Sequence, residues 1–177
     1  VFSGLIKAND PTGFGSKLEE YFHVFHMDFL NDYSTLMAIA ICGFEIILGV
    51  LLLLGFYGRK VAWGLLILII FFTFLTLYSA FFEFVTSCGC FGDAIPLTPW
   101  QSFLKDLVLL ALILIIFIYR SQIKSIVNDS FTKGLLTVAT IVIAIGIGIY
   151  TTHYLPFVDF LPYKTGNNIP SLMILPE

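Results

Sequence analysis

Four long apolar segments dominate the pattern of hydrophobic and polar positions along this chain of 177 residues. They run over about residues 34–56, 61–84, 99–119 and 134–152, with short polar stretches between them. Each is about 20 residues long with few charges, which is the length an α-helix needs to cross about 30 Å of hydrocarbon. The pattern therefore predicts an all-α fold, a polytopic transmembrane helical bundle.

Two shorter segments precede these four. The chain begins at Val1, and the mostly apolar residues 1–8 predict the tail of a first membrane helix that is truncated at its start. The stretch Asn9–Gly13 contains Pro and Gly, which mark a helix end. Ser16–Glu19 then fits a capping box, and aromatic and aliphatic residues follow at spacings of three and four. We expect an amphipathic helix at about residues 16–29, lying at the membrane surface.

These elements divide the chain into three parts. Residues 1–133 form the expected membrane bundle with its surface helix, and residues 134–152 form one additional transmembrane helix. Residues 153–177 contain four prolines and predict an extended tail that leads to an outer region.

Composition supports a membrane location. Hydrophobic residues make up 58% of the chain and charged residues 12%, whereas soluble domains average about 25% charged residues. Membrane lipid is therefore an expected partner. No basic patch with interleaved aromatic residues occurs in the sequence, so a nucleic-acid partner is not expected.

The basic residues indicate the orientation. Two polar connections hold five of the nine Lys and Arg residues together with a single acidic residue, Asp129. These basic residues are Arg59, Lys60, Arg120, Lys124 and Lys133. Because cytoplasmic loops are enriched in Lys and Arg, both connections are expected in the cytoplasm of a bacterial inner membrane. The opposite loop and the C-terminal tail are then periplasmic.

That opposite loop contains the pair Cys88-Gly89-Cys90. Two cysteines separated by one residue can bring their Cα atoms within the 4.4–6.8 Å that a disulfide needs. Such a small ring is strained, and strained, exposed disulfides are labile and oxidising. Cys88 and Cys90 are therefore candidate redox residues. A structural disulfide that pins the loop is the alternative. Two thiolates make an incomplete zinc site, so metal binding is weaker.

The loop leads into Thr98-Pro99-Trp100-Gln101, where Thr98 suits an N-cap and Pro99 the first helical position. The positive end of this helix would face the cysteines and favour a thiolate.

Charged residues also occur within the apolar segments. Glu45 lies halfway along the first long segment, where an unpaired carboxylate costs several kcal/mol. Glu83 ends a small, polar face that includes Thr76, and Lys105 and Asp106 lie in the second turn of the next helix. We expect these residues to form one polar cluster between helices. It is either a proton or ligand site or a hydrogen-bonded interhelix contact. The remaining cysteine, Cys42, is expected to act as a small hydrophobic side chain.

Three motifs resemble a known family of membrane proteins. Residues 3–8 with Asp10–Gly13 resemble the end of the first helix in DoxX-like proteins, and Gly43–Gly49 resembles their second helix with its glutamate. Cys88–Gly92, with the sequence CGCFG, resembles the loop of the MauE branch. The resemblance covers most of residues 1–120. The additional helix and the outer tail depart from the family core and resemble Bacteroidetes-type members.

The resemblance implies a DoxX-like four-helix core, thiol redox or quinone-linked electron transfer, and Cys88 and Cys90 as the redox pair. MauE-like members are linked to the maturation of disulfide-rich periplasmic enzymes. We therefore expect thiol–disulfide exchange with a periplasmic protein partner, with a quinone as a candidate electron acceptor. Two alternatives remain: a non-catalytic membrane anchor or subunit of an envelope complex, with a structural cysteine clip, or a small-molecule or proton channel around Glu45.

Overall fold

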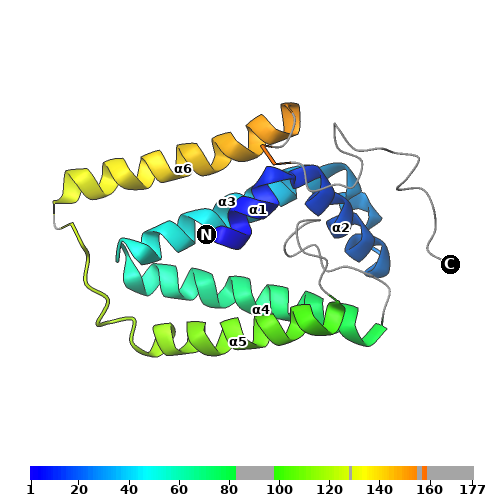
Figure 1. Ribbon diagram of the computed structural model, residues 1–177, viewed down its shortest axis with the longest axis horizontal. Helices are drawn as coiled ribbons and strands as arrows, with labels where there is room; N and C mark the ends of the chain where they lie inside the picture. The colour runs from blue at the N-terminus through cyan, green and yellow to red at the C-terminus, as the bar shows by residue number, and fades with distance from the viewer. Residues whose placement is uncertain (83–97, 128, 155–156, 159–177) are drawn as a thin grey trace.

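The computed structural model describes residues 1–82, 98–127, 129–154 and 157–158, and every regular element in these ranges is a helix (Figure 1). In chain order, the elements are α1 (Phe2–Asn9), α2 (Pro11–Val24), the 3₁₀ helix η1 (Asp28–Tyr33), α3 (Ser34–Leu53), α4 (Gly58–Phe82), α5 (Pro99–Ile118) and α6 (Ser130–His153). The predicted all-α class is confirmed.

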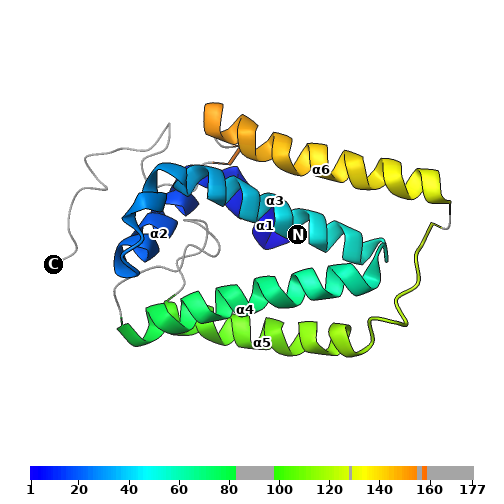
Figure 2. The ribbon, with the colours of Figure 1, turned by 180° about the vertical axis from the view of Figure 1, so that it is seen from behind.

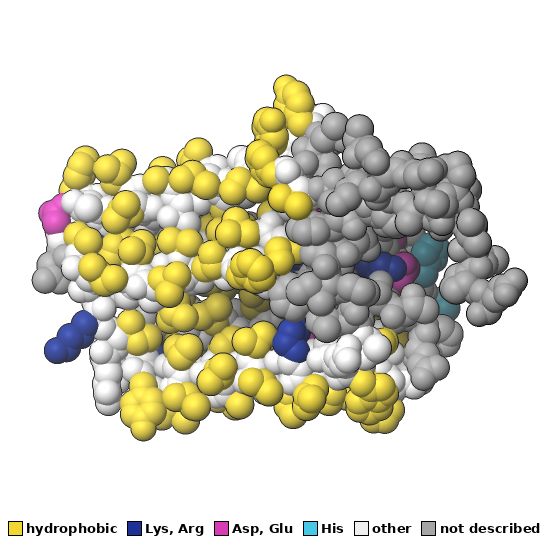
Figure 3. All heavy atoms as spheres, in the orientation of Figure 1, with side chains coloured by type: hydrophobic (Ala, Val, Ile, Leu, Met, Phe, Trp, Pro, Cys, Tyr) yellow, Lys and Arg dark blue, Asp and Glu magenta, His cyan; other side chains and the backbone are white. Residues whose placement is uncertain are grey.

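Helices α3 to α6 are long and apolar enough to cross a membrane. A helix of 20 residues, such as α5, is about 30 Å long. Large hydrophobic side chains remain exposed along these helices, and Figure 3 shows them spread over the flank of the molecule. This surface suits lipid, and the prediction of a multi-pass membrane protein is confirmed.

Helix α3 occupies the centre of the bundle. Helices α1, α2, α4 and α6 pack against it, whereas α5, among the described helices, packs only against α4. Figures 1 and 2 show α4 and α5 side by side on one flank of α3 and α6 on the other. The buried face of α3 includes Ala38, Cys42 and Ile46. Cys42 is a free, buried thiol, as its prediction as a small hydrophobic side chain requires.

The helix expected at residues 16–29 differs in its bounds and its setting. Helix α2 begins at Pro11, because the side chain of Asp10 accepts a hydrogen bond from Gly13 N–H and proline suits the first helical position. The capping box expected at Ser16–Glu19 is therefore inside the helix. The helix ends at Val24, and its residues Phe14, Leu18 and Phe22 are buried in the core. It packs on α3.

The two ends of the bundle have different connections. At the loop end, α4 stops, α5 begins and α2 lies alongside (Figure 1). At the turn end, residues 54–57 join α3 to α4, and residues 119–129 lead from α5 to α6. The N–H of Ile126 donates to the carbonyl of Leu54 over 3.1 Å, so the two connections of the turn end touch. The five basic residues of the two connections therefore share one end of the bundle. Its cytoplasmic side remains a prediction.

Candidate functional site

The predicted residues Glu83, Cys88 and Cys90 lie outside the described residues, so the geometry begins with the helices on either side. Helices α4 and α5 pack together and hold the two ends of the connecting segment. Thr98 Oγ1 accepts from Gln101 N–H over 3.4 Å, and Gln101 Oε1 accepts from Thr98 N–H over 3.1 Å. The predicted N-cap at Thr98 is confirmed and is part of a capping box with Gln101, and its effect on the cysteines stays a prediction.

Glu45 forms an ion pair with Lys7 inside the bundle. Lys7 Nζ lies 2.6 Å from Glu45 Oε2, and the two side chains are 2% and 14% exposed. The ammonium also lies over the Phe72 ring, 4.1 Å from its centroid. Attraction to a ring face adds to the pairing in a desolvated site. Because an unpaired charge is costly at this depth, each residue of the pair lowers the free-energy cost of burying the other.

The partner of Glu45, Lys7, is a candidate site residue that the sequence interpretation missed. Lys7 is the one charged residue in the otherwise apolar stretch of residues 1–8. A lysine on a membrane helix needs a partner as much as a glutamate does, and this signal could have identified the pair.

A second charged group joins α4 and α5. Asp106 is buried, and its Oδ1 lies 3.0 Å from Lys105 Nζ. Its Oδ2 accepts from Thr76 Oγ1 over 3.1 Å. The polar face expected on α4 therefore contacts the charged turn of α5 at Thr76.

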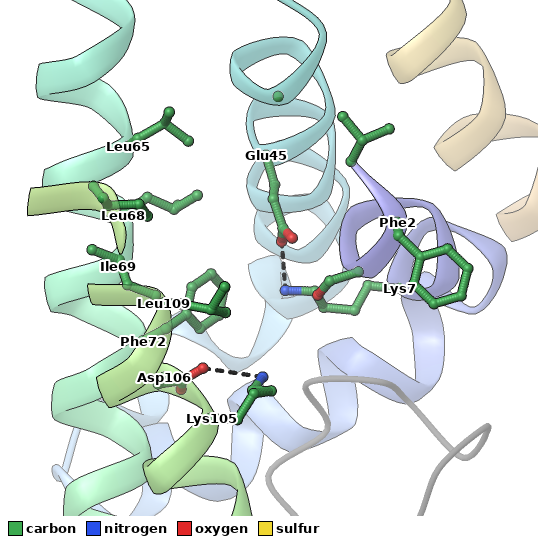
Figure 4. Close-up of a pocket in the computed structure, with 14 residues that line it drawn as sticks. Phe2, Lys7, Glu45, Leu65, Leu68, Ile69, Phe72, Lys105, Asp106 and Leu109 are labelled. Atoms are coloured by element: carbon green, nitrogen blue, oxygen red, sulfur yellow. Dashed lines mark ion pairs between the residues drawn. The ribbon is translucent and has the colours of Figure 1, made fainter. Parts of the chain in front are cut away.

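Both ion pairs line one pocket of about 410 Å³ (Figure 4). Lys7 comes from α1, Glu45 from α3, and Lys105 and Asp106 from α5. The remaining wall is mostly apolar and comes largely from α4 and α5. The structure thus brings together Glu45, Lys105 and Asp106, three residues that the sequence interpretation grouped, and adds Lys7. The arrangement supplies ammonium donors and carboxylate acceptors beside a hydrophobic cavity.

All the residues that line this pocket fall within the match to a known protein family. The family model described as "Methylamine utilisation protein MauE" matches residues 1–119. The chain belongs to the MauE family. The match includes the four charged residues of the pocket as well as Cys88 and Cys90, and it stops before α6. The predicted resemblance to MauE is confirmed, whereas the broader likeness to DoxX-like proteins remains a prediction.

One curated relative extends further than the MauE match. It is "Protein TlpB" from Flavobacterium psychrophilum, which is 26% identical over an alignment of 150 residues that covers 80% of this chain and 39% of the relative. The chain thus spans about two fifths of the length of that relative. No solved structure matches the chain.

Proposed function

We propose that this MauE-family protein is a membrane component of periplasmic thiol–disulfide redox chemistry and exchanges electrons through Cys88 and Cys90. One observation carries the proposal: a MauE-family chain has a Cys-Gly-Cys sequence in the connection between α4 and α5, two helices that pack together. The loop end then faces the periplasm of a bacterial inner membrane, and the basic turn end faces the cytoplasm. A DoxX-like core fits the same role.

The exchange conserves atoms and electrons. A thiolate of a periplasmic partner attacks the Cys88–Cys90 disulfide and forms a mixed disulfide, and the second partner thiol then releases the partner in oxidised form. Two electrons move to Cys88 and Cys90, which become thiols. Reoxidation needs a two-electron acceptor, and a lipid-soluble quinone that takes up two electrons and two protons suits a membrane protein.

Replacement of both cysteines tests this function. In cells with Cys88→Ser and Cys90→Ser together, we expect periplasmic dithiol proteins to accumulate in reduced form, as measured by thiol tagging of the periplasmic fraction. Cys42→Ser is the matched control, because this thiol is buried in α3 and takes no part in the exchange. An unchanged redox state of periplasmic thiols in the double variant would contradict the proposal.

A second candidate function is a non-catalytic membrane anchor for an outer region or an envelope complex. The observation that favours it is the length of the TlpB relative, of which this chain covers 39%. In that case Cys88 and Cys90 form a structural clip. The double serine variant would then leave periplasmic thiols unchanged, and a complex containing the protein would disappear from a native gel.

A further inference from the structure

The pocket between the two ion pairs lies at mid-depth in the bundle. Its walls on α4 and α5 include Leu68 and Leu109, which lie near the middle of these helices. Among the described helices, α5 contacts neither α1 nor α3, so the cavity separates them. At this depth the pocket is level with the hydrocarbon of the bilayer, so a lipid-soluble ligand can reach it between α5 and its neighbours.

One side of the pocket can bind a polar head group. An ammonium has three donors. Lys7 Nζ lies 2.6 Å from Glu45 Oε2 as an ion pair and over the Phe72 ring, and within the described part of the chain Glu45 Oε2 has no hydrogen-bond partner. The Lys7 side chain is 2% exposed and faces the cavity (Figure 4). A ligand oxygen can therefore accept a further hydrogen bond from Lys7.

The charges restrict the ligand to an uncharged one. The two ammonium groups of Lys7 and Lys105 are balanced by the carboxylates of Glu45 and Asp106. A charged head group would leave a net charge buried in the membrane, which is costly. An uncharged head with acceptor oxygens gains hydrogen bonds without that cost. The volume of about 410 Å³ is within the range typical of small-molecule sites, roughly 300–1,000 Å³.

We propose that this pocket binds a neutral, membrane-soluble amphiphile, with its acceptor oxygens at the Lys7–Glu45 pair and its apolar body against Leu68, Leu109 and Ile113. A neutral glycerolipid and a lipoquinone both have this chemistry. The inference goes beyond the proposed thiol exchange and stands on the pocket alone, so it can hold or fail independently of Cys88 and Cys90.

Photolabelling tests the site directly. The full chain in lipid nanodiscs is labelled with a monoacylglycerol that carries a diazirine in its acyl chain, and the labelled residues are mapped by mass spectrometry. We expect label on the pocket walls of α4 and α5. Leu109→Trp fills the pocket and should reduce this label at least about tenfold, equivalent to about 1.4 kcal/mol. Ile113→Phe fills the same space if the tryptophan variant does not fold.

The control lies on the same helix. Leu112 is 51% exposed and does not line the pocket, so Leu112→Trp should leave the labelling of the pocket walls unchanged. Equal labelling of wild type and Leu109→Trp would overturn the proposal, and so would equal loss in Leu109→Trp and Leu112→Trp.

A double substitution tests the binding of the polar head group. Lys7→Met together with Glu45→Met removes both charges at once, which leaves no buried charge without a partner. We expect about a tenfold loss of labelling because the head group loses its hydrogen bonds, a difference of about 1.4 kcal/mol. Unchanged labelling would overturn the assignment of the head group.

Competition identifies the source of the ligand. Stronger competition by a decyl-substituted benzoquinone supports a lipoquinone, and stronger competition by monooleoylglycerol supports a neutral lipid. The strongest competition from decanoate, an anion, would overturn the proposal that the head is uncharged.

Discussion

The loop end and the turn end of this bundle are held together in different ways. In the half of the bundle toward the loop end, side chains join segments that are far apart in sequence. Thr151 Oγ1 donates to the carbonyl of Ala8 over 2.7 Å, across 143 positions. The side-chain amide of Asn9 donates to the carbonyl of Val158 and accepts from its N–H, across 149 positions. The Lys7–Glu45 ion pair, at mid-depth in the bundle, likewise joins two segments that are far apart in sequence.

At the turn end, the described side chains form hydrogen bonds to residues close to them in sequence. Arg120 donates to the carbonyl of Phe117, and Asp129 accepts from Thr132, each three positions away. A long-range hydrogen bond there is between backbones, from Ile126 N–H to the carbonyl of Leu54. Side-chain hydrogen bonds between distant segments thus occur toward the loop end, where the proposed exchange takes place, whereas those of the turn end are local.

The largest effect is expected at the buried ion pair. Lys7→Met leaves the Glu45 carboxylate without its partner and should lower the free energy of unfolding by about 3 kcal/mol. Chemical unfolding in detergent micelles measures it. Lys17→Met is the matched control, because Lys17 pairs with Glu20 at 24% and 41% exposure and should cost at most about 1 kcal/mol. Equal losses would mean that the buried, long-range ion pair stabilises the bundle no more than the exposed, local one does.

The next effect is a test of the turn end. Gly55 has a φ of 69°, and a Cβ there would collide with the backbone of Lys124. Gly55→Ala should therefore lower the free energy of unfolding by roughly 2 kcal/mol. Gly134→Ala should instead raise it by about 0.5–1 kcal/mol, because this glycine is in a helix and a Cβ added to it would meet no atom within 4 Å in the described part of the chain. The same sign for both variants in thermal unfolding would contradict the backbone account of the turn end.

A smaller effect is expected where α4 meets α5. Thr76→Val removes the hydrogen bond to Asp106 and should lower the free energy of unfolding by about 1 kcal/mol. Thr73→Val, one turn earlier, removes a hydrogen bond only to Ile69 in its own helix and should have little effect. If the two valine variants have the same free energy of unfolding, the hydrogen bond from Thr76 to Asp106 does not stabilise the bundle.

The smallest effect is a pH dependence at the turn end. Hydrogen bonds from Thr132 lower the pKa of the Asp129 carboxyl below its usual value. This carboxylate therefore stabilises the helix cap above the pKa of the unfolded chain, and the contribution disappears as pH falls through the lower pKa of the folded state. Asp129→Asn keeps a capping side chain without the titration. We expect it to flatten the acid side of the thermal stability profile, and an unchanged profile would exclude the cap as its source.

The sequence predicted the membrane helices well because their apolar runs match the thickness of a bilayer. It misplaced the start of α2, because Asp10 and Pro11 mark the end of one helix and equally cap the next. Glu45 was recognised as requiring a partner, but its partner lies on α1, with α2 between them along the chain. Pairing across helices depends on how the bundle packs, and a pattern along one helix does not contain that information. By contrast, Thr76 and Asp106 were grouped in advance, since α4 and α5 are consecutive membrane helices.

The most direct test of the proposed exchange is the redox cycling of Cys88 and Cys90 in intact cells carrying Cys42→Ser. Cells receive a pulse of membrane-impermeant reductant, and an impermeant thiol reagent of known mass then tags the protein at intervals. The account predicts two tags immediately after the pulse and their loss as the pair is reoxidised. Failure to gain tags, or tags that persist after the reductant is washed away, would contradict it.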